Sequence, residues 1–97
     1  MGDTGRNTNG AVGTSRSPHV LLVDPDDEFA QALIRDFCRS RIAVTVAHTL
    51  AEARSILHQG LPSLDVVLLE LHLPDGRGES LLRDFEACPR QPVVVIT

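Results

Sequence analysis

The sequence predicts an α/β domain built on a parallel β-sheet. Short apolar runs, typical of strands that are buried on both faces, alternate along the chain with segments whose apolar residues recur at helical spacing. The 97 residues, of which 42% are hydrophobic, support one small domain rather than two. Strands that alternate with helices predict right-handed crossovers and helices on both faces of the sheet.

A strand and a helix are predicted to follow a polar N-terminal tail. Residues 1–18 are rich in Gly, Thr, Asn and Ser, so we expect a disordered tail there. The run HVLLV opens a domain that is expected to cover residues 19–97. Acidic residues at 26–28 favour the start of a helix, which apolar residues at helical spacing extend to about Arg39.

The second strand and the second helix carry clear local signals. IAVTVA, residues 42–47, alternates and is β-branched, which predicts an edge strand. Thr49 and Glu52 match a capping box at the start of a helix. Gly60 is placed to end that helix.

The C-terminal part repeats the strand–helix pattern and ends in a further strand. DVVLLEL, residues 65–71, is predicted to be the third strand, followed by the Gly-rich loop LPDGRG. A third helix carries Leu81, Leu82 and Phe85 and is expected to stop at Pro89. PVVVIT, residues 92–97, is predicted to be a fourth strand.

Charge and composition exclude several classes of function. The formal net charge of −4 argues against direct contact with nucleic acid. The apolar runs are far shorter than the ~20 residues that a membrane span requires, and the polar N-terminus lacks the apolar core of a signal peptide. We therefore expect a cytoplasmic protein without a membrane segment. Cys38 and Cys88 are expected to be reduced, structural thiols.

Acidic residues and a hydroxyl follow the predicted strands. Because parallel strands present their carboxyl ends at one edge of the sheet, we expect Asp24, Asp26, Glu70 and Thr97 to lie together there. Carboxylates that lie close together repel one another, which raises the pKa of at least one of them unless a cation neutralises the group. Mg²⁺, which takes oxygen ligands, is the natural occupant of such a site.

Three motifs, in order and at appropriate intervals, resemble the receiver domain of bacterial two-component response regulators. HVLLVD with its trailing acids resembles the first strand and acidic pair, DVVLLELHLPDGRG resembles the phosphoacceptor strand and its loop, and PVVVIT resembles the fourth strand with its switch residue. The resemblance implies a flavodoxin-like doubly wound parallel sheet. We expect it to be incomplete here, with four strands and three helices and without the last strand and helices. Within this family, the chain most resembles receivers that precede an ATPase and a DNA-binding domain in transcription regulators.

The resemblance also implies roles for individual residues and partners. Glu70 stands where the family has its phosphoacceptor Asp, and Thr97 stands at the switch position. Asp24, Asp26, Glu70 and the backbone carbonyl of His72 are the implied ligands of Mg²⁺. The implied partners are a sensor histidine kinase or the output domain of a regulator, and a homodimer is compatible with the family.

The chain departs from the family at three points that matter for phosphorylation. The extra methylene of Glu70 displaces its carboxylate by ~1.5 Å, one C–C bond, which spoils the geometry of attack and makes the residue a partial mimic of a phosphorylated Asp. Pro25 stands where the family has a second acid, and the chain has no Lys to pair with a phosphoryl group. We therefore expect a phosphorylation-independent regulatory module with no catalytic residues.

Two other interpretations remain open. Asp24 and Asp26 form an Asp-x-Asp pair after an apolar strand, as in Mg²⁺-dependent aspartyl phosphatases, where the first acid is the nucleophile and the second the general acid and base. Such enzymes need a later Lys, which this chain lacks. Alternatively, the chain is a non-signalling interaction fragment whose open sheet edge pairs with another chain.

Overall fold

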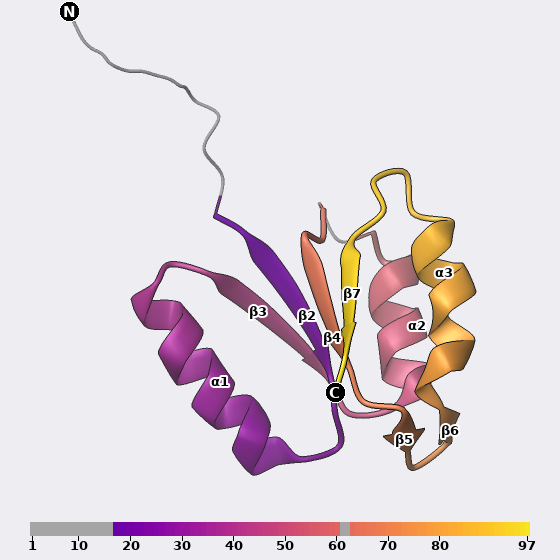
Figure 1. Ribbon diagram of the computed structural model, residues 1–97, viewed down its shortest axis with the longest axis horizontal. Helices are drawn as coiled ribbons and strands as arrows, with labels where there is room; N and C mark the ends of the chain where they lie inside the picture. The colour runs from indigo at the N-terminus through magenta and orange to yellow at the C-terminus, as the bar shows by residue number, and fades with distance from the viewer. Residues whose placement is uncertain (1–16, 61–62) are drawn as a thin grey trace, which may run out of the picture.

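The computed structural model describes residues 17–60 and 63–97 of the chain. Most of the expected tail, residues 1–16, lies outside the described residues. In the described part, four parallel strands form one sheet with α-helices on both sides (Figure 1). The strands are β2 (His19–Val23), β3 (Ala43–Ala47), β4 (Val66–Leu69) and β7 (Val93–Ile96).

The strand order confirms the predicted doubly wound topology. The sheet runs β3-β2-β4-β7, so that the chain moves outward in one direction from β2 to β3 and then in the other direction to β4 and β7. The prediction that 42–47 is an edge strand is confirmed, because β3 pairs with β2 alone. The second edge is β7, which pairs with β4.

In the described ranges, three α-helices cover the sheet, as expected. They are α1 (Asp27–Arg39), α2 (Leu50–His58) and α3 (Leu82–Glu86). In Figure 1, α1 lies on one side of the sheet, and α2 and α3 lie on the other. None of the helices in the described ranges is long and apolar enough to cross a membrane.

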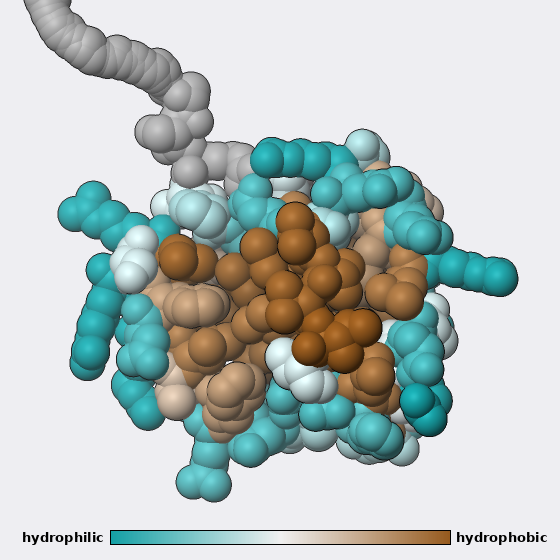
Figure 2. All heavy atoms as spheres, viewed as in Figure 1, coloured by the Kyte–Doolittle hydropathy of each residue, from teal (hydrophilic) through white to brown (hydrophobic). Residues whose placement is uncertain are grey.

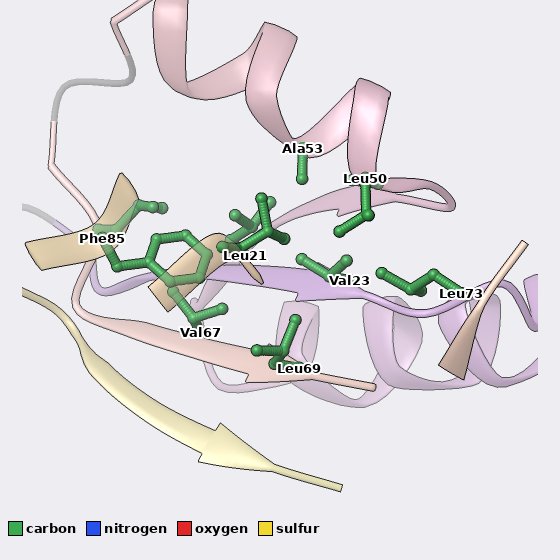
Figure 3. Packing of buried hydrophobic residues seen from close by; sticks show 11 residues of the cluster. Leu21, Val23, Leu50, Ala53, Val67, Leu69, Leu73 and Phe85 are labelled. Carbon is green, nitrogen blue, oxygen red and sulfur yellow. The ribbon is translucent and has the colours of Figure 1, made fainter. Parts of the chain in front are cut away.

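The main hydrophobic core lies between the sheet and α2 and α3. Leu21, Val23, Val67 and Leu69 are fully buried. Figure 3 shows that they point from the two central strands towards this side. Their alternation is the period-two pattern of strands, in which every second side chain lies on the same face. Further apolar residues complete this core, among them Ala47, Leu50, Ala53, Leu64, Leu73, Leu81 and Phe85.

Local capping residues place the starts of α1 and α2 where the sequence predicts them. Asp26 is the N-cap of α1, and its carboxylate accepts a hydrogen bond from the Phe29 N–H at 3.1 Å. Thr49 is the N-cap of α2 and accepts from the Glu52 N–H at 3.0 Å. The two helices therefore begin at the carboxyl ends of β2 and β3, close to the acidic edge of the sheet.

The segment after β4 is more structured than the sequence predicts. The LPDGRG loop contains a small antiparallel ribbon of β5 (His72–Leu73) and β6 (Gly76–Arg77). A 3₁₀-helix, Gly78–Leu81, then leads into α3, which is a single short α-helix. Gly76 permits the tight ribbon because its φ of 148° lies in a region that residues with a Cβ atom rarely adopt.

Candidate functional site

The backbone places the predicted site residues in one row at the carboxyl edge of the sheet. Val23 and Leu69 are register partners, as are Leu69 and Ile96, so the residues that follow each strand lie at the same level. Backbone hydrogen bonds continue this row, since the Glu70 N–H donates to the Val23 carbonyl at 2.9 Å and the Thr97 N–H donates to the Leu69 carbonyl at 3.0 Å. Asp24, Glu70 and Thr97 are thus brought to neighbouring strand tips.

Asp24 and Asp26 are tied into the turn that joins β2 to α1. Asp24 is 9% exposed, and its Oδ1 accepts a hydrogen bond from the Asp26 N–H at 2.8 Å. The exposed Asp26 uses its own Oδ1 as the N-cap of α1. Asp26 therefore has a structural role in the turn, which accounts for an acid at this position without a metal or a catalytic step.

The carboxylate of Glu70 is folded back onto the loop that follows it. Its Oε2 accepts a hydrogen bond from the His72 N–H at 2.9 Å, and Nδ1 of the His72 ring lies 3.5 Å from the same oxygen. The exposed His72 ring therefore lies beside this carboxylate.

The contact with His72 also sets the electrostatics of Glu70. The hydrogen bond from the His72 backbone N–H, which outweighs an opposing contribution from burial, lowers the pKa of Glu70 below its ordinary value. A carboxylate with a lowered pKa is ionised at neutral pH, so Glu70 carries a negative charge under these conditions.

The donor set at this edge does not form a closed metal site. In the described part of the chain, no three or more His, Cys, Asp and Glu residues are grouped so that they could hold one metal ion. Asp26 is turned to the helix start, which leaves Asp24 and Glu70 as the carboxylates at adjacent tips. Binding of Mg²⁺ by Asp24, Asp26, Glu70 and the His72 carbonyl stays a prediction.

A residue that the sequence did not single out, Asp75, fixes the position of this loop. Its carboxylate accepts hydrogen bonds from the backbone N–H groups of Leu50 at 2.8 Å and Ala51 at 3.0 Å, at the start of α2. These two bonds lower the pKa of Asp75. The tip of the β5–β6 ribbon is thereby attached to a helix that lies 25 residues earlier in the chain. In the sequence, the Pro-Asp-Gly triplet signals only a turn.

We expect Asp75→Asn to destabilise the protein at neutral pH and to alter its response to acid. A depressed pKa contributes stability above the value of the unfolded chain, 3.8, and this contribution is lost as the pH falls through the lower value of the folded state. The uncharged Asn cannot show this loss. Urea unfolding of both proteins at neutral and acidic pH measures the effect, and a stability difference that does not shrink in acid would contradict it.

His48 is a second residue whose position the sequence did not predict. It follows β3 at the same edge, and its Nε2 lies 3.3 Å from Oδ1 of Asp27 in α1. Its Nδ1 lies 3.7 Å from Oε1 of Glu52 in α2. The half-exposed ring therefore stands between the first turns of two helices. These contacts account for His48 as a structural residue.

Comparisons with known proteins give the family of this fold and site. No family model matches the chain. The chain is 31% identical to Protein PetR from Rhodobacter capsulatus over 80 aligned residues. The alignment covers 82% of this chain and 33% of PetR. The chain spans only about a third of this curated relative.

Solved structures match the fold over most of the chain. The non-phosphorylated HemR receiver domain from Leptospira biflexa is 27% identical with a TM-score of 0.72, over 82% of this chain and 63% of that one. A response regulator protein from Burkholderia pseudomallei, whose structure holds a phosphorylated aspartic acid, a calcium ion and citrate, is 26% identical with a TM-score of 0.72, over 82% of this chain and 46% of that one. With its strand order and acidic strand tips, the chain is a partial receiver domain of the two-component response regulators.

Proposed function

We propose that this chain is a receiver module of a response regulator in which Glu70 occupies the phosphoacceptor position and makes the module independent of phosphorylation. The observation that carries the proposal is the position of Glu70, at the tip of the central strand β4 and beside the buried Asp24. Its lowered pKa supports a constant negative charge at that position. Such a charge imitates part of the effect of a phosphoryl group, which carries about −1.5 to −2 charges.

Two features make Glu70 a poor nucleophile towards a phosphodonor. Its Oε2 accepts a hydrogen bond from the His72 N–H, and the adjacent His72 ring further stabilises the ionised carboxylate. Its carboxylate stands one carbon further from the backbone than that of an Asp, which misplaces it for in-line attack. These features favour a regulatory role over a catalytic one.

The partners that fit this role are those of a signalling module. We propose that the module works with a sensor histidine kinase or with the output domain of a transcription regulator, as the similarity to response regulators supports. The formal charge of −4 and the acidic strand tips favour protein partners over direct contact with nucleic acid. A cytoplasmic location is part of the same proposal.

We expect no stable acyl phosphate to form on the wild-type chain after incubation with a small-molecule phosphodonor and Mg²⁺. Intact-protein mass spectrometry, with hydroxylamine treatment to identify an acyl phosphate, measures the outcome. Wild-type labelling that disappears in Glu70→Gln would overturn the proposal. The response regulator protein from Burkholderia pseudomallei, whose structure holds a phosphorylated aspartic acid, serves as the positive control for the reagents.

The variant Glu70→Asp tests whether side-chain length alone prevents the reaction. We expect labelling to remain weak in this variant, because Pro25, in place of the second acid, is unchanged. Strong labelling of Glu70→Asp would show that the rest of the site is competent. In that case the extra methylene of Glu70, relative to Asp, would by itself make the module independent of phosphorylation.

A further inference from the structure

His48 follows the edge strand β3 and lies between the first turns of two helices. Its Nε2 is close to Oδ1 of Asp27 in α1, at 3.3 Å, and its Nδ1 is 3.7 Å from Oε1 of Glu52 in α2. In Figure 1 these two helices lie on opposite sides of the sheet. One imidazole ring therefore stands between the two helical layers of the domain.

The two carboxylates beside the ring are placed by the starts of the helices. The His48 N–H donates to Oε1 of Glu52 at 2.6 Å, and the Glu52 N–H donates to the hydroxyl of Thr49 at 3.0 Å. This reciprocal arrangement is a form of capping box, which orders the start of α2. Asp27 belongs to the first turn of α1, directly after the N-cap Asp26. The ring therefore meets two acids whose positions do not depend on the ring itself.

A neutral imidazole cannot satisfy both of these carboxylates. It has a proton on one ring nitrogen and a lone pair on the other, so one of the two carboxylates always faces a lone pair. Nε2 is enclosed by the protein, and in the described part of the chain it makes no hydrogen bond, although Oδ1 of Asp27 is near. A protonated ring has an N–H on each nitrogen, so it can donate to both carboxylates at once.

The surroundings of the ring favour a positive charge on it. Within residues 17–60 and 63–97, neither Asp27 nor Glu52 has an arginine partner that neutralises its charge. In Figure 2, hydrophilic side chains (teal) line the margin below the brown centre, where the strands of Figure 1 end. The segments around His48 carry further acids, namely Asp24 and Asp26 in the turn after β2, Glu28 in the first turn of α1 and Asp75 against the start of α2. An imidazolium is attracted by acids on each of these segments.

We propose that His48 is a proton-dependent clip, which joins the start of α1 to the start of α2 when its ring is protonated. Histidine is the side chain whose charge ordinarily changes between about pH 5 and 8. As the pH rises, the ring loses a proton, one of its two contacts with a carboxylate is lost, and the helices are joined less firmly. The proposal does not depend on the chemistry of Glu70, and labelling experiments leave it untouched.

The start of α2 is also attached to the loop after β4. Asp75 accepts hydrogen bonds from the N–H groups of Leu50 and Ala51, which belong to the same helical turn as Glu52. This turn is thus held from one side by the loop and from the other by the clip. Protonation of His48 therefore acts on the segment that positions the loop beside Glu70.

Urea unfolding at about pH 5.5 and about pH 8 tests the clip. At each pH, the folding constant of the wild type is divided by that of His48→Gln, whose side chain stays neutral. The other histidines are present in both proteins, so their effects cancel. We expect this ratio to be about two- to fivefold larger at the acidic pH, which is the size of partly exposed ion pairs, and to shrink in high salt.

Asp27→Asn and Glu28→Gln form a matched pair of variants. Both remove a carboxylate from the first turn of α1 and lose a similar interaction with the helix dipole, but of the two only Asp27 lies beside the ring. We expect Asp27→Asn to reduce the pH response and Glu28→Gln to preserve it. Asp27→Asn should have no such effect once residue 48 is Gln, because the two changes remove the same interaction.

Amide hydrogen exchange gives a local measurement at the two helix starts. At about pH 5.5, we expect exchange at residues 29–31 and 52–54 to be about two- to fivefold faster in His48→Gln than in the wild type. Circular dichroism shows whether each variant is folded, and Asp27→Asn provides a second perturbation if His48→Gln is not.

Three results would overturn the proposal. They are the same pH response in His48→Gln and the wild type, equal effects of Asp27→Asn and Glu28→Gln on that response, and equal amide exchange at the two helix starts in acid.

Discussion

Gly78→Ala is expected to destabilise the protein by about 3 kcal/mol, because the added methyl group has no room. A Cβ atom at Gly78 would collide with the backbone carbonyl oxygen of Glu70, and it would lie 3.1 Å from both Cδ1 of Leu69 and Cα of Leu71. Backbone atoms cannot turn aside as the end of a flexible side chain can. The Gly78 N–H also donates to the Leu71 carbonyl at 2.8 Å, so the two segments are held in contact.

Gly60→Ala is the control, because Gly60 is required for its backbone conformation and not for lack of space. Gly60 has a φ of 77°, and nothing lies within 4 Å of a Cβ atom at that position, so its replacement should cost only about 1 kcal/mol of backbone strain. Urea unfolding followed by far-ultraviolet circular dichroism is suitable, since the chain has neither Trp nor Tyr. Equal losses in the two variants would contradict the steric explanation. Changes in amide NMR shifts at residues 70–78 in Gly78→Ala alone would locate the damage.

Leu21→Ala is expected to lower the free energy of unfolding by about 2–5 kcal/mol, the range for large-to-small changes in a core. Leu21 is completely buried in the middle of β2, where it lies between register partners on β3 and β4. A domain of this size has a total stability of roughly 4–12 kcal/mol, so the variant is close to the limit of folding. The same urea titrations measure the loss.

Gln31→Ala is a matched control on the surface. Gln31 is exposed in the middle of α1, where Ala has a helix propensity at least as good, so its stability should change by no more than about 0.5 kcal/mol. A large loss in this control would indicate that α1 contributes through contacts that the structure does not contain. A small loss in Leu21→Ala would contradict the placement of this residue at the centre of the core.

Much of the fold follows from local patterns in the sequence. The apolar runs specify the four parallel strands because strands buried on both faces need side chains that are apolar at consecutive positions. Asp26 and Thr49 specify the starts of two helices because a cap depends only on the residues next to it. The short third helix and the ribbon before it were not predicted in detail. Their geometry depends on how Gly76 and Gly78 pack against α2 and β4.

The sequence by itself also determined that acids stand at the strand tips, since the position of a residue after a strand fixes its edge of the sheet. Only the tertiary structure decided that Asp75 holds the start of α2, 25 residues earlier in the chain. The physical reason is distance along the chain. Apolar periodicity and helix caps depend on neighbouring residues, so the sequence shows them directly. Hydrogen bonds and packing between segments 20 or more residues apart depend on how those segments are arranged in space.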